Sequence, residues 1–248
     1  MKLLFVGDTH GTKHLAKVEG FLAQARLGPR DAIIHCGDIG IAWLGEEDEA
    51  LRYWRGLPYK VLVCLGNHEN YRWVSGQPLA RRFGALGHDL GGRVFAPRPG
   101  QIASLGGKSL WFFPGGYSID FYFRTPGRNL FVEELLSEAD ARHAMDRVLK
   151  RAHTDFIVSH DGPRAFVTQA FGFPIAQPHA QYWQHTGQAP GIRAHPGFAL
   201  DELYNQPERF GQWFFGHHHQ DIAQGKLRCL WNQAALVDTR GGETVLLG

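Results

Sequence analysis

Short apolar runs, each followed at once by a polar turn, recur along the chain. The clearest is residues 61–65, Val-Leu-Val-Cys-Leu, which leads directly into Gly66-Asn67-His68-Glu69. A run of this length and composition predicts a buried strand. The polar turn then stands at a carboxyl edge, where open α/β sheets build their sites. The same pattern delivers four further turns, at residues 7–11, 37–38, 160–162 and 216–219.

The same periodicity predicts the remaining elements. Apolar residues at helical spacing favour a helix over 12–26, and charge placement favours a second over 46–55. Ser137-Glu138-Ala139-Asp140 resembles a capping box that opens a helix ending near Ala152, and a short helix is expected over 200–204. Strands are expected at 1–6, 32–36, 61–65, 101–105, 109–114, 155–159, 212–215, 221–224, 227–232 and 244–247.

Two segments give weak patterns. Residues 71–99 are rich in Gly, Pro and Arg, which indicates loops. Arg72 lies nearest to the 66–69 turn, so it is a candidate contact for an anionic substrate, against the alternative of a solvated face. Residues 162–199 have little periodicity and many aromatic side chains. A long stretch of this kind is typical of a lid or binding loop.

A third segment, residues 117–124, places Asp120 and Arg124 within an aromatic stretch. The two charges suit either a structural ion pair or a phosphate contact, and the sequence leaves both interpretations open. In the same way, the aromatic side chains of residues 162–199 are suited either to stacking a base or to packing the lid.

Composition narrows the class of protein. The 248 residues are 44% apolar and 20% charged, as in an ordinary soluble domain, and the formal net charge is only +2. No apolar run has transmembrane length, and no cleavable leader pattern opens the chain. The three cysteines lie in or beside apolar runs, which fits a reducing compartment. We therefore expect one cytoplasmic domain over residues 1–248, with a lid-like insert at 162–199.

The polar turns share metal-binding chemistry. Mixed carboxylate, imidazole and amide donors without thiolate favour Mn, Fe or Zn over Ca. The donors exceed what one ion needs, so two ions that share a bridging carboxylate are expected, as in sites that displace groups at phosphorus. The strand-end donors are Asp8, His10, Asp38, Asn67, His68, His160, His217, His218 and His219.

Taken in order, the five turns resemble the calcineurin-like metallophosphoesterase superfamily, over residues 7 to 219. The resemblance implies a four-layer α/β/β/α sandwich of two mixed β-sheets and a dinuclear metal centre. It places Asp8, His10, Asp38 and His219 on a first metal, and Asn67, His160 and His217 on a second, with Asp38 bridging. His68 would be the general acid, oriented by a neighbouring carboxylate. His218 falls on a variable motif position and is left out of the metal set.

The implied activity is hydrolysis of phosphomonoesters or phosphodiesters by a metal-bridged hydroxide, with Mn favoured as the metal. Asp38 is followed by Ile39-Gly40-Ile41 rather than by the Asp-Arg-Gly of the phosphoprotein phosphatase branch. A small-molecule or nucleotide substrate is therefore favoured over a phosphoprotein. The low net charge gives no strong nucleic-acid signature. The sequence does not indicate an oligomeric state.

Other functions compete with this one. A nuclease or a protein phosphatase of the same superfamily would keep the same metal ligands. A non-catalytic scaffold of the same fold would lack the catalytic His, whereas His68 and all seven expected ligands are present here. His217-His218-His219-Gln220-Asp221 also begins like a metallo-β-lactamase signature, but Ile222 stands where that signature needs another His.

Overall fold

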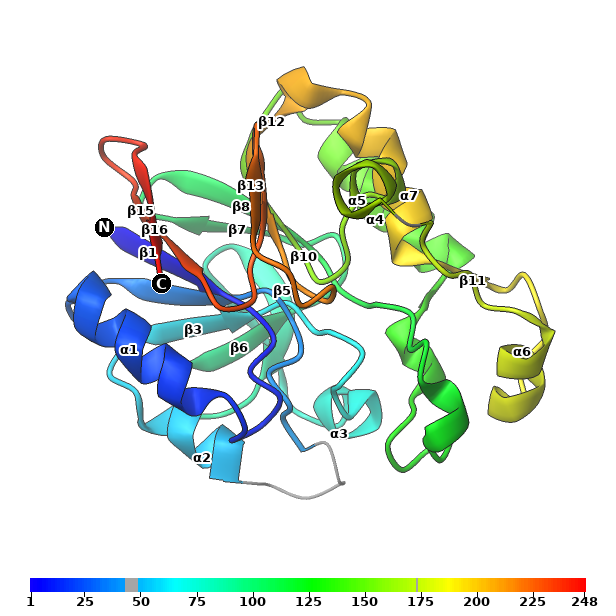
Figure 1. The fold of residues 1–248 in the computed structure, drawn as a ribbon. Helices are drawn as coiled ribbons and strands as arrows, with labels where there is room; N and C mark the ends of the chain where they lie inside the picture. The colour runs from blue at the N-terminus through cyan, green and yellow to red at the C-terminus, as the bar shows by residue number, and fades with distance from the viewer. Residues whose placement is uncertain (43–48, 173) are drawn as a thin grey trace.

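The computed structural model describes residues 1–42, 49–172 and 174–248. Its centre is two large β-sheets that face each other, with helices on their outer sides (Figure 1). The first sheet has eight strands, in the spatial order β16 (Thr244–Leu247), β15 (Ala234–Asp238), β1 (Lys2–Val6), β2 (Ala32–His35), β3 (Lys60–Val63), β6 (Val94–Pro97), β5 (Ala85–Asp89) and β4 (Leu79–Arg82).

The second sheet has six strands, in the order β13 (Ile222–Gln224), β14 (Leu227–Cys229), β12 (Phe210–Phe215), β10 (Thr154–Ser159), β8 (Lys108–Phe113) and β7 (Ile102–Leu105). The central strands of each sheet are parallel and the outer ones antiparallel. Both sheets are therefore mixed. A separate small ribbon pairs β9 (Leu136–Ser137) with β11 (Arg193–Ala194).

Helices cover the outer face of each sheet. Helices α1 (Leu15–Ala25) and α2 (Glu49–Gly56) pack on the first sheet, and α4 (Glu138–Leu149), α5 (Arg164–Phe171) and α7 (Pro196–Tyr204) pack on the second. Between the sheets lies a core of small aliphatic and aromatic side chains, in which Phe5 stacks on Phe214 with ring centroids 3.9 Å apart. These four layers confirm the expected α/β/β/α sandwich.

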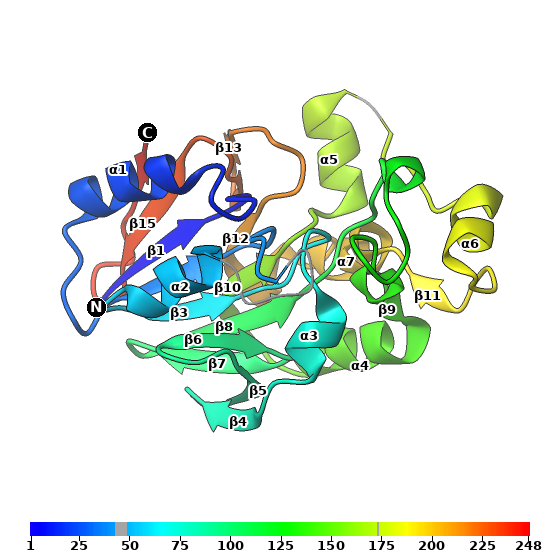
Figure 2. The same cartoon turned by 90° about the horizontal axis from the view of Figure 1, so that it is seen from below.

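The described helices also include α3 (Tyr71–Ser75) and α6 (Ala180–Thr186), with short 3₁₀ turns at η1 (Phe121–Phe123), η2 (Val132–Glu134) and η3 (Pro207–Arg209). The segment after β8 and helix α6 lie beyond one end of the two sheets in both views (Figure 2). No helix among the described residues is long and apolar enough to cross a membrane.

Residues 71–99, expected to be loops, fold instead into α3 and three strands that extend the first sheet. The strand β4 alternates exposed and half-buried residues, since it is the edge of its sheet. An edge strand needs no continuous apolar run, so the pattern that revealed the central strands is absent there. The strand β15 was missed as well.

Residues 162–199, expected to lack regular structure, contain α5, α6 and the start of α7. Gly172 and Gly187, which suggested loops, are the left-handed residues that end α5 and α6. Other elements match within a few residues, and Ser137 caps α4 as expected, its Oγ accepting from Asp140 N at 3.0 Å. Residues 46–48 of the expected second helix, and Phe173 of the expected lid, lie outside the described residues.

Candidate metal centre

The five polar turns meet where the parallel strands of both sheets end. Asp8 follows β1, Asp38 follows β2, Asn67 follows β3, His160 follows β10, and His217 with His219 follows β12. The apolar strands fix the backbone on one side of each turn, and the packing of the two sheets brings the turns together. The sequence-based expectation of one convergence point is confirmed.

The backbone of these turns is strained in a way that marks a functional site. Five of the seven expected ligands have positive φ, although none is glycine: Asp8 (53°), His10 (47°), Asp38 (55°), His217 (69°) and His219 (50°). Such a conformation costs about 1–3 kcal/mol per residue and persists only where the surroundings impose it. Positive φ is concentrated on the candidate ligands. This indicates that the fold imposes the directions of their side chains at the cost of local backbone strain.

Two glycines allow the backbone to approach the candidate carboxylate ligands closely. A Cβ on Gly66 would collide with Oδ1 of Asp38, and one on Gly216 would collide with Oδ2 of Asp8. The buried Glu69 then ties two of the turns together, because its carboxylate accepts from the backbone N–H of Gly66 and, at 3.0 Å, from that of Gly40. Glu69 therefore supports the turns rather than joining the donors.

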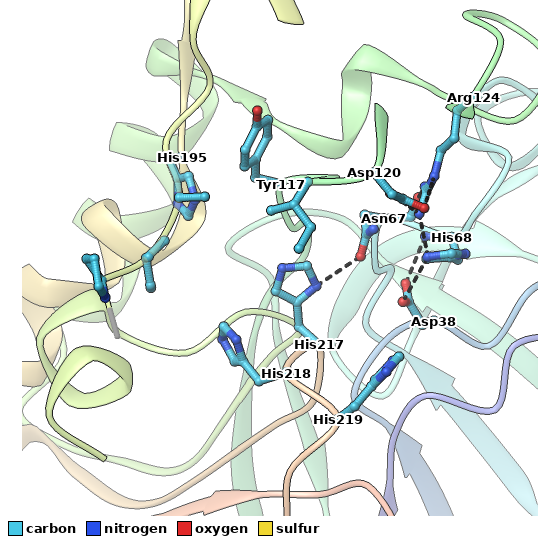
Figure 3. A pocket seen from close by; sticks show the side chains of 14 residues that line it. Asp38, Asn67, His68, Tyr117, Asp120, Arg124, His195, His217, His218 and His219 are labelled. Atoms are coloured by element: carbon cyan, nitrogen blue, oxygen red, sulfur yellow. Dashed lines mark hydrogen bonds and ion pairs between the residues drawn. The ribbon is translucent and has the colours of Figure 1, made fainter. Parts of the chain in front are cut away.

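One set of donors gathers around the carboxamide of Asn67 (Figure 3). Its Oδ1 lies 3.0 Å from His160 Nε2. It also lies 3.0 Å from His217 Nδ1, the contact that the figure marks with a dashed line. His160 Nε2 also lies 3.2 Å from Asp38 Oδ1. Amide oxygen, carboxylate and two imidazoles thus converge on one point, as the resemblance implied for the second metal.

A second set surrounds His10. Its Nε2 lies 2.9 Å from His219 Nε2 and 3.9 Å from Asp38 Oδ2, and His219 Nε2 is 3.7 Å from Asp8 Oδ1. Groups of three drawn from Asp8, His10, Asp38, His68, His160 and His219 lie close enough to hold a metal ion. Asp38 contacts both sets, through Oδ1 at 3.2 Å to His160 and through Oδ2 at 3.9 Å to His10.

The electrostatics of these residues fit a bound cation. Burial raises the pKa of Asp8 to about 8, and burial lowers the pKa of His10 to about 3 and that of His219 to about 4. Each shift reports a group whose charged form lacks solvation. A divalent ion supplies charge to a buried carboxylate and needs neutral imidazoles as ligands, so these residues suit it.

His68 sits beside a guanidinium. Its backbone N–H donates to Asp38 Oδ1 at 2.8 Å, and its Nε2 lies 2.6 Å from Arg124 Nη2 and 3.9 Å from Asp38 Oδ2. Burial lowers the pKa of His68, and Arg124 acts in the same direction, against Asp38. Arg124 lies closer to the His68 ring than Asp38 does, and the expectation that a neighbouring carboxylate orients His68 stays a prediction.

The two open interpretations of Asp120 and Arg124 turn out to be compatible. Arg124 Nη2 lies 2.7 Å from Asp120 Oδ1, so the ion pair exists, and both residues also line the cavity at the metal centre. Arg72, by contrast, is exposed on α3, with Nε 4.0 Å from Glu133, and is absent from the described cavity lining. His218 Nε2 lies 2.8 Å from the buried carboxylate of Asp161.

The cavity has a volume of about 480 Å³. Beyond the strand-end turns, its described walls come from residues 117–124, 174–176 and 195, and include the apolar side chains of Ile119 and Ile175. Behind it lie Ser118 and Glu134, both buried, which the sequence analysis overlooked. The available signal for Glu134 was a pair of carboxylates, Glu133 and Glu134, within the otherwise apolar stretch 130–136.

Comparison with known proteins adds three results. The family model of the calcineurin-like phosphoesterases matches residues 1–221. Among curated proteins, none matches this chain. One solved crystal structure is 12% identical, covers 99% of this chain and 98% of its own, and has a TM-score of 0.53.

Two further solved structures are similar. A putative 5'-nucleotidase from Staphylococcus aureus, in complex with alpha-ketoglutarate, is 13% identical with a TM-score of 0.53; it covers all of this chain, which spans about half (52%) of that protein. An archaeal phosphodiesterase is 10% identical with a TM-score of 0.43, covering 100% of this chain and 99% of its own. At these identities, the two structures with a TM-score of 0.53 support the fold alone.

Proposed function

Because this chain belongs to the calcineurin-like phosphoesterase family, we propose that it hydrolyses small phosphomonoesters or phosphodiesters with two divalent metal ions. The observation that carries the proposal is the pair of donor sets that share Asp38. One set holds Asp8, His10 and His219, and the other holds Asn67, His160 and His217. Two adjacent ions are the usual arrangement for displacement at phosphorus.

The ions, when bound, supply an activated water and neutralise charge on the phosphoryl oxygens. Asp38 is the residue suited to hold both, since its two carboxylate oxygens face different sets. We propose Mn²⁺ as the preferred ion, because imidazole, carboxylate and amide oxygen together suit it. Fe or Zn would satisfy the same donors.

His68 is the proposed general acid. It lines the cavity and lies outside both proposed donor sets, and imidazole is the side chain that most often gives a proton to a leaving group. The guanidinium of Arg124 lies against it and carries a fixed positive charge at the cavity wall. An anionic ester bound there would lie between the metal ligands and this cation.

The cavity favours a small substrate. A volume of about 480 Å³ is in the range of small-molecule pockets. Its described wall combines the apolar Ile119 and Ile175 with the aromatic Tyr117 and supplies one guanidinium, from Arg124. We therefore propose a substrate with one phosphoryl group at the metals and an organic leaving group, a nucleoside included.

The test is hydrolysis by the purified protein of a panel of mono-, di- and cyclic-nucleotide esters, with p-nitrophenyl phosphate and its bis ester, before and after Mn²⁺ is added to metal-free protein. We expect release of product only with metal and a metal-to-protein ratio near two. A protein that binds two ions but hydrolyses none of the esters would support the non-catalytic scaffold instead. Failure to bind metal would refute the proposal altogether.

A further inference from the structure

A buried hydroxyl joins the metal centre to the guanidinium beside His68. Ser118 is 1% exposed and lies between β8 and η1. Its Oγ accepts a hydrogen bond from Asn67 Nδ2 at 3.0 Å and another from Arg124 Nη1 at 2.9 Å, and it donates to Glu134 Oε2 at 2.6 Å. Two side chains of the segment between β8 and β9 therefore meet the distant Asn67 on one oxygen atom.

These three contacts use the full capacity of the hydroxyl. A serine hydroxyl has one proton and two lone pairs. The amide of Asn67 and the guanidinium of Arg124 are both donors, so each needs a lone pair. The proton is then left for Glu134, and the hydroxyl has a single satisfied orientation.

Glu134 fixes that orientation from the other side. Its carboxyl group is buried and accepts from the backbone N–H of Ser118 at 3.0 Å and from the hydroxyl of Tyr182 at 3.1 Å. Tyr182 lies on α6 and is also fully buried. The acceptor for the serine proton is thus held by a backbone amide and by a separate helix.

The orientation matters for Asn67. With Nδ2 on Ser118, its Oδ1 points at His160 Nε2 and at His217 Nδ1. Figure 3 shows the contact with His217. A flipped carboxamide would turn the NH₂ group, which can only donate, toward two imidazole nitrogens that must present lone pairs to a metal. Ser118 favours the orientation that binds metal, because it offers Asn67 an acceptor.

The same hydroxyl positions Arg124. Nη1 donates to Ser118 Oγ at 2.9 Å and to the backbone oxygen of Asn67 at 3.3 Å, while Nη2 lies 2.6 Å from His68 Nε2. A planar guanidinium held at one nitrogen has little freedom to rotate at the other. Asp120 holds the other side of the guanidinium, accepting from Arg124 Nε at 2.9 Å, so the distance between the guanidinium and His68 depends on Ser118 together with Asp120.

We propose that Ser118, oriented by Glu134, is a positioning residue that sets both the carboxamide of Asn67 for the second metal and the guanidinium of Arg124 beside His68. The proposal rests on the proposed function for the catalytic half and on metal binding alone for the other half. The hydroxyl of Ser118 then contributes both to retention of the second metal and to protonation of the leaving group by His68.

The experiment compares Ser118→Ala with Ser118→Thr, which keeps the hydroxyl. Metal-free proteins are titrated with Mn²⁺ by calorimetry. Loss of a partner behind a metal ligand costs about 10–100-fold in metal affinity or activity. We expect Ser118→Ala to weaken one of two Mn²⁺ sites by about that factor, and Ser118→Thr to restore it.

Kinetics provide the second measurement. We expect Ser118→Ala to lower kcat more on esters with poor leaving groups than on p-nitrophenyl phosphate at saturating Mn²⁺, since protonation by His68 matters more there. Ser109→Ala is the matched control. Ser109 Oγ also makes two partly buried hydrogen bonds: it donates to Asp155 Oδ2 at 2.8 Å and accepts from Asp155 N at 2.9 Å. Ser109 is absent from the described cavity lining.

Wild-type Mn²⁺ affinity and kcat in Ser118→Ala would overturn the proposal, as would equal losses in Ser118→Ala and Ser118→Thr. If Ser118→Ala does not fold, Ser118→Cys keeps the side-chain volume with a much weaker donor and gives the same comparison. If the wild type hydrolyses no ester, the proposed function fails, yet the Mn²⁺ titration still decides whether Ser118 positions Asn67.

Discussion

The metal ligands and the side chains around His68 come from contrasting parts of the molecule. The ligands follow strands of both sheets, and their directions are set by backbone turns, five of them with positive φ. Ser118, Arg124 and Glu134 lie in the segment between β8 and β9, where the described backbone has only two short 3₁₀ turns. There, side-chain hydrogen bonds set the geometry.

This difference predicts how substitutions in the two parts will affect metal binding and catalysis. The backbone of a ligand on a strand-end turn keeps its place when a neighbour changes, because strands and glycines hold the turn. A side chain in the second part depends on its hydrogen-bond partners and moves when one is removed. Substitution of a ligand should therefore abolish metal binding, whereas substitution in the segment between β8 and β9 should weaken the metal affinity or the chemistry without abolishing binding.

The largest effect is expected for Asp38→Asn. Asp38 faces both donor sets, so loss of its charge should release both ions and lower turnover by about 10³-fold or more. The number of metal ions per protein molecule, measured by elemental mass spectrometry, tests the loss of both ions. Asp155→Asn, at the start of β10 and bonded to Lys108 at 3.0 Å, is the control and should keep its metal. Full metal content in Asp38→Asn would remove the bridging role.

His68→Ala separates metal binding from chemistry. The variant should retain two ions, because His68 lies outside both proposed donor sets, and should lose about 10²–10⁴-fold in kcat on esters with poor leaving groups. The loss on p-nitrophenyl phosphate should be much smaller, since that leaving group needs no proton. An unchanged rate on alkyl esters would exclude His68 as the acid. His88→Ala, on β5, is the control.

Arg124→Ala and Arg72→Ala form a matched pair that tests the second part directly. The Arg124 side chain is 5% exposed and contacts His68, whereas that of Arg72 is 65% exposed beside Glu133. We expect Arg124→Ala to lower kcat/KM by about 10–100-fold with metal retained. Arg72→Ala should change it by less than about twofold, because exposed ion pairs contribute little. Equal effects in steady-state kinetics would contradict this contrast.

The two parts also differ in how far the sequence could predict them. Asp8, Asp38, Asn67 and His160 each follow an apolar run directly, so a local pattern located them and the parallel topology explained their meeting. The strands β4, at the edge of the sheet, and β5, next to it, escaped the same reasoning, because both are only partly buried and carry no continuous apolar run. A local sequence pattern thus predicts the polar residues that follow buried strands.

Contacts in the second part have no such local signal. Ser118 reaches Asn67 across 51 positions, and Arg124 reaches His68 across 56. Both contacts depend on the path that the segment between β8 and β9 takes over the folded sandwich. They also depend on the side chain of Glu134, which becomes buried only on folding. The sequence showed Asp120 and Arg124 as charges worth attention, but tertiary packing decided that Arg124 points at His68.

The smallest and most diagnostic effect concerns Glu134, whose burial raises its pKa from 4.5 to about 8. A folded-state pKa above the unfolded value means that the protonated form contributes stability below pH 4.5, and that this stability is lost as pH rises toward 8. Arg124 and the hydroxyls of Ser118 and Tyr182, which face the carboxyl group, moderate the shift.

Glu134→Gln keeps the size of the side chain and cannot ionise. In metal-free protein, the wild-type Tm should therefore fall more steeply than that of Glu134→Gln between pH 5 and 9, by a few degrees, about what 1 kcal/mol produces in a chain of this size. Thermal unfolding followed by circular dichroism across that pH range measures the difference, and groups common to both proteins cancel in it. Parallel curves would mean that Glu134 is ionised in the folded state at neutral pH, with Arg124 as its counter-charge. The hydroxyl of Ser118 would then be fixed by a charged acceptor, and its hold on Asn67 would be stronger than a neutral network gives.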